Sequence, residues 1–309
     1  MAKLRVGITI GDPSGIGPEV TRKAMRKIKG LADFLVIGDA RVWNKVTGVE
    51  FLDLANIDKR HFQFGKITAE YGRASIQYLD KALDLIENKR IDCLVTCPIS
   101  KEAINKAGFN FSGHTEYFAG RCKADNPVMM LLNDRLRFSL VTRHIPLKSV
   151  SDEIESGGLK RTILLSHKAL KDWFGVSAPR FIVAGVNPHA SDNGVIGKEE
   201  VRTIIPLLKG LKRQGIFIDG PIGADTAIAA AAHKKYDCVI AMYHDQALIP
   251  LKLLGNASGV NLTIGLPFIR TSPLHGTAFD IAGKNLASED SLISAIKLAI
   301  KCTLNQKKA

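Results

Sequence analysis

Three histidines stand where predicted strands end. His144, His189 and His244 each come two or three residues after a largely apolar, strand-like run. Neutral imidazoles are common ligands of divalent metals, and three of them leave a position open for a substrate or a water molecule. Each histidine taken singly is also consistent with a hydrogen-bonded turn, and their wide spacing matches no compact zinc motif. A metal site and three polar turns are therefore both open interpretations.

The stretch YHDQ places His244 directly before Asp245, just after the apolar run YDCVIAM. Strand ends in α/β proteins face the crevice in which ligands bind, so an imidazole beside a carboxylate favours chemistry there. A polar turn with its hydrogen bonds satisfied is the alternative.

Two glycine-containing turns could receive an anion. GDPSGIGPEV (11–20) opens a predicted helix whose backbone N–H groups and dipole would favour a negative charge. It matches neither the P-loop pattern nor G-x-G-x-x-G, so a tight strand–helix turn is equally consistent. FSGHTEYFA (111–119) sets His114 and Thr115 before another helix, as donors to a phosphate or carboxylate, or with Thr115 as a simple N-cap.

Two later segments carry further polar groups. The first, 252–272, contains Lys252, Asn261 and Arg270, and arginine is suited to a bidentate grip on phosphate or carboxylate. Both cations could equally be surface charges. The second, 272–284, contains His275, Gly276 and Asp280. An acid in such a loop could hold a ribose diol, as in NAD enzymes, although a plain loop is the alternative.

The elements that must position these residues alternate between strand and helix. Most of the apolar runs are continuous rather than alternating, which is typical of strands buried on both faces of a largely parallel sheet. Strand–helix alternation over this length predicts an α/β fold. SVSD (149–152) indicates a capping box, and Pro18 stands at the start of a helix. Strands are expected at 4–10, 34–37, 93–97, 136–142, 180–186, 215–218 and 237–242, and helices at 18–29, 69–89, 150–173, 198–213, 224–235 and 288–304.

Composition narrows the function classes. The 309 residues are 46% hydrophobic and 24% charged, an ordinary globular balance with enough chain for two domains. The five cysteines form no C-x-x-C pair, which indicates a reduced, cytoplasmic protein. The N-terminus lacks the pattern of a signal peptide, and no stretch approaches the ~20 apolar residues of a membrane span, so we expect no membrane association.

The net charge is +13, from 43 Lys and Arg against 30 Asp and Glu. A basic balance attracts anions such as nucleic acids, phosphorylated metabolites or dinucleotides. The excess is scattered and forms no basic tract interleaved with aromatics. We therefore expect no nucleic-acid partner and favour a small anionic substrate.

Taken together, the motifs resemble those of the 4-hydroxythreonine-4-phosphate dehydrogenases of pyridoxal phosphate biosynthesis. The resemblance covers residues 4 to about 290, and GHTE and YHDQ are its most specific parts. The last motif also resembles a loop of the isopropylmalate dehydrogenases, with Phe279 where those enzymes usually have proline. The motifs occur in the family's order: GDPSGIGPE, CPISK, GHTEYF, VTRHIPL, NPHA, GADT, YHDQALIPLK, VNLTIGLPFIRTS and HGTAFDIAGK.

The resemblance implies a two-lobed α/β fold of the isocitrate/isopropylmalate dehydrogenase type, with largely parallel sheets and a central cleft. We expect a cofactor-side domain at 1–125 plus 265–309 and a metal-ligand domain with dimer contacts at 126–264. It further implies a homodimer whose active sites use residues from both chains.

Site residues also follow from the resemblance. It implies that the three histidines His144, His189 and His244 bind one divalent cation: zinc, cobalt, manganese or magnesium. NAD or NADP is the implied cofactor, with His275, Gly276 and Asp280 on its side. Substrate contacts are implied for His114, Thr115, Lys252, Asn261 and Arg270.

The implied reaction oxidises and decarboxylates 4-phosphohydroxy-L-threonine to 3-amino-2-oxopropyl phosphate. Asp245 and Asp225 are candidates for the general base, and each could instead orient a metal-bound histidine. A sister activity on D-threonate or D-erythronate 4-phosphate would use the same metal and phosphate residues. A non-catalytic anion-binding protein is the alternative from another class.

Overall fold

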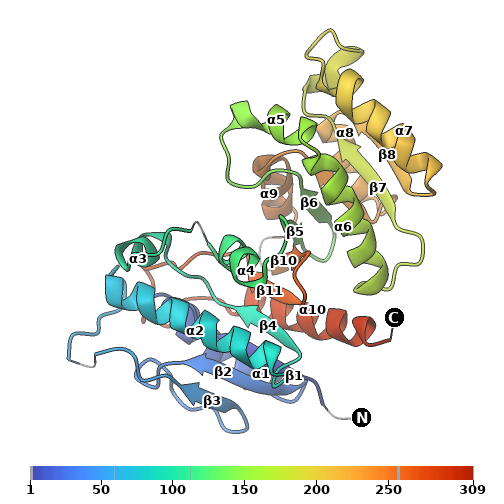
Figure 1. Cartoon of the computed structure of the whole chain (residues 1–309). Helices are drawn as coiled ribbons and strands as arrows, with labels where there is room; N and C mark the ends of the chain where they lie inside the picture. The colour runs from blue at the N-terminus through green and yellow to red at the C-terminus, as the bar shows by residue number, and fades with distance from the viewer. Residues whose placement is uncertain (1–2, 59, 112, 256–257, 309) are drawn as a thin grey trace. The chain divides into compact units, whose positions relative to one another are not determined.

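The computed structural model describes residues 3–58, 60–111, 113–255 and 258–308 (Figure 1). The chain forms two compact units. Unit 1 comprises Met1–Pro127 and Leu266–Leu304, and unit 2 comprises Val128–Gly265 and Asn305–Ala309. The sequence-based assignment of one domain to the cofactor and the other to the metal stays a prediction.

Unit 1 is built on five strands whose pairings are parallel. Four of its helices lie wholly inside it, and most of a fifth, α10, does too. The strands, in spatial order, are β3 (Glu50–Asp53), β2 (Asp33–Gly38), β1 (Arg5–Thr9), β4 (Cys93–Thr96) and β11 (Arg270–Pro273). The helices are α1 (Gly17–Ile28), α2 (Ala69–Glu87), α3 (Lys101–Lys106), α4 (His114–Cys122) and α10 (Asp290–Gln306).

Unit 2 has a mixed set of six strands. Strand β5 runs antiparallel to its neighbours β10 and β6, and the four strands from β6 to β8 are mutually parallel. In spatial order they are β10 (Val260–Ile264), β5 (Val128–Leu132), β6 (Arg137–Leu140), β9 (Cys238–Ala241), β7 (Arg180–Ala184) and β8 (Phe217–Ile222). The helices are α5 (Val150–Glu155), α6 (Gly158–Asp172), α7 (Ile205–Arg213), α8 (Ala224–Ala232) and α9 (His244–Leu253), with short segments η1 (Leu147–Ser149), η2 (Pro188–Asp192) and η3 (Glu200–Ile204).

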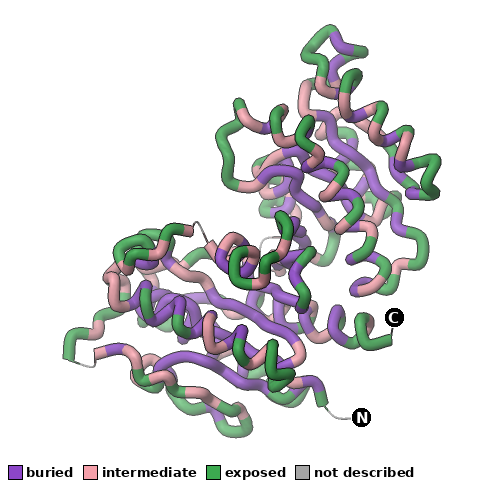
Figure 2. The backbone as a smooth tube through the Cα atoms, in the orientation of Figure 1, coloured by how far each residue is buried: buried purple, intermediate pink, exposed green. Residues whose placement is uncertain are grey.

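The core of each unit follows the continuous apolar runs. All four residues of β4 and of β9 are buried, as are all five of β5. Figure 2 shows this as buried strands flanked by helices with exposed outer faces. The predicted α/β class with largely parallel strands is confirmed, because strands covered on both faces need apolar residues at every position.

The helix predicted at 150–173 is two helices. Gly157 has a φ of +100°, a left-handed conformation that ends α5 and lets α6 start in a new direction. The capping box predicted at 149–152 is wrong, because the Ser149 side chain makes no cap hydrogen bond. Ser149 closes the turn η1 with a ψ of 2°, whereas a capping residue is normally extended.

Four strands and two helices, α3 and α9, were not predicted from the sequence. Strands β3, β5, β10 and β11 are short, and β11 is polar although Arg270, Thr271 and Ser272 are all buried. Helix α9 begins at His244, where the sequence suggested a turn. Among the described residues, no helix is long and apolar enough to cross a membrane.

Candidate functional site

The strand order of unit 2 brings the three histidines to one edge of the sheet. Strand β9 lies between β6 and β7, and all three run parallel. His144 follows β6, His244 follows β9 and His189 follows β7. Neighbouring strands are ~4.8 Å apart, so the residues at their carboxyl ends start close together.

His144 and His244 form a pair with metal-site spacing. Their ring centroids are 5.7 Å apart and the rings are inclined by 44°. Two imidazoles that coordinate one zinc ion through nitrogens about 2.0–2.1 Å from the metal have ring centres roughly 5–6 Å apart. Both residues are at least partly open to solvent. The pair therefore fits two positions of a divalent-metal site.

His189 lies on the far side of β9, in an unusual turn. It begins a run of left-handed residues within η2, and its Cα lies 3.8 Å from where a Cβ on Gly223 would stand. Among the described residues, no three His, Cys, Asp or Glu side chains are grouped so that they could hold a metal ion. Two of the three predicted ligands are thus paired, while His189 is exposed at a neighbouring strand end.

Asp245 is bonded to a predicted ligand. The Nδ1 atom of His244 lies 2.7 Å from Oδ1 of Asp245. A carboxylate only accepts, so this contact places the imidazole proton on Nδ1 and leaves the lone pair on Nε2. The arrangement is the one that commonly orients a metal-binding histidine.

Asp225, the other acidic candidate, is exposed in the first turn of α8. Its Oδ1 lies 3.0 Å from the position of a Cβ on Gly223, the same glycine that borders the backbone of His189. Asp225 and the turn of His189 therefore share a border at Gly223, where a larger residue would crowd the carboxylate.

A buried cation lies in unit 1. Arg270, at the start of β11, is 1% exposed, and its Nε donates to Thr96 Oγ1 at 3.1 Å. Its guanidinium lies 5.9 Å from the ring centroid of Phe118. Burial lowers the pKa of Arg270 to about 9, against an opposing effect of Glu116. A bound anion would offset the cost of keeping this charge away from water.

His114 belongs to the same cluster. Burial, and then the positive charge of Arg270, lower the pKa of His114 well below its ordinary value, so the ring is neutral at physiological pH. Its Nε2 is buried without a hydrogen-bond partner. The N-cap suggested for Thr115 is wrong, because Gly113 is the N-cap of α4 and Thr115 is a buried residue of its first turn. Thr96, the partner of Arg270, gave no signal in the sequence beyond its place at a strand end.

The two remaining predicted substrate residues belong to unit 2. Lys252 is exposed in the last turn of α9. Asn261 lies in β10, and its Oδ1 is buried without a hydrogen-bond partner. Such an orphaned acceptor costs about 1–3 kcal/mol unless a ligand satisfies it, which marks Asn261 as a candidate contact.

The predicted cofactor segment packs on the glycine-rich turn that precedes α1. The backbone N–H of Ile16 donates to Thr277 O at 3.0 Å, next to His275 and Gly276. The segment is fixed further along, where Glu19 accepts from the backbone of Asn285 and Ala287. Asp280 is exposed between these two anchors.

Asp12, at the end of β1, was not among the predicted site residues. It is 0% exposed, and its Oδ1 accepts from Ser14 N and Ser14 Oγ, each at 2.9 Å. Its Oδ2 has no hydrogen-bond partner. Burial raises the pKa of Asp12 to about 6, although the bonds from Ser14 oppose the shift.

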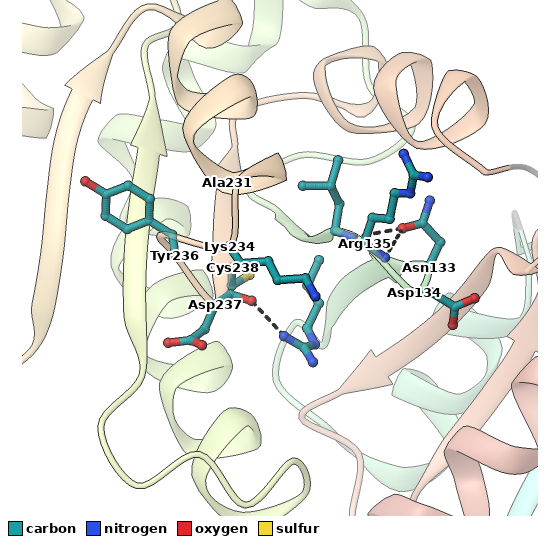
Figure 3. A pocket seen from close by; sticks show the side chains of 10 residues that line it. Asn133, Asp134, Arg135, Ala231, Lys234, Tyr236, Asp237 and Cys238 are labelled. Carbon is teal, nitrogen blue, oxygen red and sulfur yellow. Dashed lines mark hydrogen bonds between the residues drawn. The ribbon is translucent and has the colours of Figure 1, made fainter.

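A pocket of unit 2 lies at the opposite end of the strands from the histidines. It has a volume of about 290 Å³ and is lined at the start of β6 and β9 by residues such as Arg137 and Asp237. Figure 3 shows Lys234 and Tyr236 beside it, with the carbonyl of Asp237 accepting from Arg137. This pocket therefore shares no residue with the predicted metal site.

A family model, related sequences and solved structures all match this chain to the same family. The family model described as pyridoxal phosphate biosynthetic protein PdxA matches residues 11–299. A 4-hydroxythreonine-4-phosphate dehydrogenase of a Sulfurihydrogenibium species is 42% identical over 96% of this chain and 98% of its own length. A D-threonate 4-phosphate dehydrogenase of Cupriavidus necator is 40% identical over 94% of this chain and 95% of its own. The crystal structure of the Klebsiella pneumoniae 4-hydroxythreonine-4-phosphate dehydrogenase superposes with a TM-score of 0.87, at 33% identity and 98% coverage of both chains.

Proposed function

Because this chain belongs to the PdxA family of pyridoxal phosphate biosynthetic proteins, we propose that it oxidises and decarboxylates 4-phosphohydroxy-L-threonine with NAD or NADP. The product is 3-amino-2-oxopropyl phosphate. The observation that carries this proposal is the spacing of His144 and His244, whose ring centroids are 5.7 Å apart at the carboxyl edge of parallel strands.

His144 and His244 would hold the divalent cation, with His189 as the third ligand. A bound divalent cation supplies Lewis acidity toward the substrate hydroxyl and lowers its pKa. Asp245 supports this role by holding the Nδ1 proton of His244, which directs Nε2 outward as the ligand atom. The cation is zinc, cobalt, manganese or magnesium: three imidazoles suit zinc, and oxygen ligands from substrate and water would allow the other three to serve.

We assign different roles to the two acidic candidates: one orients a histidine and the other is the general base. We assign Asp245 to orienting His244, because its carboxylate is already engaged at 2.7 Å. Asp225 is then the candidate general base that accepts the hydroxyl proton, since it is exposed beside the turn of His189. A bound nicotinamide would accept the hydride from the hydroxyl-bearing carbon. Loss of carbon dioxide would then leave the electrons of the broken carbon–carbon bond on the product as an enolate, which takes up a proton to give the ketone.

Cations and orphaned polar atoms are proposed to bind the phosphorylated substrate. Arg270 and His114 in unit 1 offer a buried guanidinium and a neutral imidazole, and Thr115 follows in the same helix turn. Lys252 in unit 2 offers an exposed ammonium, and Asn261 offers an amide whose Oδ1 is buried. Arginine and lysine supply the charge that a phosphate needs, and uncharged donors supply direction.

The cofactor is proposed to contact the segment His275–Gly276 and Asp280. Support comes from the hydrogen bonds that fix this segment against the turn before α1 and against Glu19. NAD and NADP both satisfy this proposal. The five cysteines, all free, support a cytoplasmic enzyme.

A homodimer with shared active sites is proposed from the surface of unit 2. Six of its exposed large apolar side chains lie in the segments that carry the three histidines: Ile145, Leu147, Val195, Ile196, Ile249 and Leu253. Exposed apolar residues gathered in this way mark interaction sites. A second copy of the chain that covers them would lie beside the metal ligands.

Turnover with the two substrates tests the proposal. Purified protein with zinc or cobalt is assayed for NADH or NADPH formation on 4-phosphohydroxy-L-threonine and on D-threonate 4-phosphate. We expect turnover of the first, abolished by His144→Ala. Turnover of the aldonate phosphate alone would show the sister activity instead, a second candidate that the 40% identity to the Cupriavidus enzyme favours. Tight substrate binding without redox turnover would indicate an anion-binding protein.

A further inference from the structure

The turn that carries His189 has a left-handed backbone over five consecutive residues. The φ angles from His189 to Asn193 are 53°, 51°, 67°, 46° and 57°, and only then does a glycine follow. For residues with a Cβ this conformation costs roughly 1–2 kcal/mol each, and it normally occurs singly. Strain of this kind persists only where the surrounding structure imposes it, and it concentrates at functional sites.

A buried carboxylate holds the entrance to this turn. Glu200 is 0% exposed, and its Oε1 accepts from the backbone N–H of Val186 at 2.9 Å and of Asn187 at 2.8 Å. Its Oε2 accepts from Asn187 Nδ2 at 2.9 Å. Three donors thus converge on one carboxylate, and all three belong to the two residues that precede Pro188 and His189.

Gly185 and Ser191, on either side of this stretch, are also fixed by hydrogen bonds. Gly185, directly before Val186, donates to Ile222 O at 2.8 Å and accepts from Gln246 Nε2 at 2.9 Å. Beyond the histidine, the buried Ser191 accepts through its carbonyl from Gly194 and Ile196. The only backbone between these anchors is the short stretch 188–190. The position of His189 is therefore set by what holds residues 185–187 and 191.

Glu200 starts a π-helical segment, η3, that leads into α7. π-Helical segments are rare in proteins as a whole, but those that occur are often found at functional sites. No other described acidic side chain accepts from the backbone of residues 185–187. Glu199, next to it, accepts from the side chain of Asn187 but not from the backbone of residues 185–187.

We propose that Glu200 is a positioning residue: its carboxylate imposes the left-handed turn and thereby presents His189 as the third metal ligand. This inference rests on the proposed function, because it presupposes the metal site. Glu200 itself touches neither metal nor substrate.

Cobalt binding by the full-length apoprotein tests the inference without turnover. Co²⁺ is titrated and its visible absorption gives both affinity and ligand geometry. We expect Glu200→Gln to weaken binding by about 10–100-fold, the usual effect of losing a supporting partner. The oxygen of the introduced amide can still accept from the two backbone N–H groups. Its NH2 group, however, is a donor and faces another donor, Nδ2 of Asn187. We also expect kcat at saturating metal to stay within about threefold of wild type, because an ordered metal restores the ligand.

A matched control separates positioning from loss of stability. Ser166→Ala removes another buried hydrogen bond of unit 2, to Ser139 Oγ at 2.7 Å, and should lower the melting temperature without changing Co²⁺ affinity. Asn187→Ala, at a less buried position, removes one of the three donors to Glu200, together with the bond from the same Nδ2 to Glu199. It should weaken binding by a smaller factor, so it replaces Glu200→Gln if that variant does not fold.

Each outcome decides one question. Wild-type affinity in both Glu200→Gln and Asn187→Ala, with weakened binding in His144→Ala, would overturn the role of Glu200 and leave the metal site standing. Equal Co²⁺ affinity in wild type and His144→Ala would instead overturn the metal site of the proposed function.

Discussion

The imidazole rings of His144 and His244 lie 5.7 Å apart because their strands, β6 and β9, are adjacent and parallel. Leu140, the last residue of β6, is paired with Ala241, the last of β9. Each histidine follows its strand by a few residues, so the two rings meet above the same edge. Asp245 then fixes the tautomer of one of them.

Removing either imidazole should abolish tight metal binding. We expect His144→Ala and His244→Ala to weaken Zn²⁺ binding at least about 100-fold, since ligand loss exceeds the effect of losing a supporting partner. Isothermal titration of the apoprotein measures this. His233→Ala is the matched control, an exposed histidine at the end of α8 in the same unit. An equal loss in the control would refute the assignment.

Arg270→Lys should raise KM for the phosphorylated substrate more than it lowers kcat. A hydrogen bond to a charged group contributes about 1.5–3 kcal/mol, which corresponds to roughly 10–100-fold in affinity. Lysine keeps the charge but loses the fork and the bond to Thr96. Steady-state kinetics give the two constants. Arg121→Lys, an exposed arginine of α4, should leave both unchanged. An unaltered KM in Arg270→Lys would remove Arg270 from the substrate site.

Asp12 should make stability depend on pH. Its folded pKa, about 6, lies above the unfolded value of 3.8, so the folded state retains a proton that the unfolded state has lost. Stability should therefore fall as pH rises from about 4 to 6 and then level off, by roughly 3 kcal/mol at 1.36 kcal/mol per pKa unit.

Urea midpoints between pH 4 and 8 test this. Asp12→Asn should lose this part of the pH dependence, because asparagine does not titrate. Asp33→Asn, an exposed carboxylate of the same unit, should follow the wild-type curve. Identical curves for Asp12→Asn and wild type would show that Asp12 titrates normally.

Because the turn of His189 is strained, a glycine substitution within it should stabilise the protein. Ala190 has a φ of 51°, so Ala190→Gly should stabilise the protein by about 0.5–1 kcal/mol, because glycine adopts this conformation without a steric penalty. Ala229→Gly, on the exposed side of α8, should cost about 1 kcal/mol. Denaturant unfolding of the two variants should thus give opposite signs. Destabilisation by both would mean that the turn is not strained.

A charge on the apolar surface of α9 should dissociate the proposed dimer. Leu253 is 80% exposed and Ile249 is 59% exposed one turn earlier. We expect Leu253→Glu to shift the dimer to monomer in sedimentation velocity, since burying an unpaired carboxylate opposes association. Leu31→Glu places the same charge on an exposed leucine of unit 1 and should leave the dimer intact. A dimeric Leu253→Glu protein would place the interface elsewhere.

The α/β class and the set of polar strand ends can be predicted from local sequence. Strands covered on both faces must be apolar throughout, and that local property is legible in runs such as the one ending at Met242. The resemblance of the motifs to those of a known family then predicted which family the chain belongs to. The residues that follow His244 were interpreted as a turn, because nothing local distinguishes a polar turn from the first residues of α9.

Which strand ends are neighbours follows from the three-dimensional fold and not from local sequence. The order β6–β9–β7 depends on pairings between distant segments, and it alone places His144 beside His244. The same holds for Arg270, a polar residue whose burial follows from β4 and α4 packing around it, and for Glu200, whose carboxylate reaches back to residues 186 and 187. Local sequence carries propensity and pattern, whereas pairing order, burial of polar groups and imposed backbone strain arise from contacts between segments far apart in the chain.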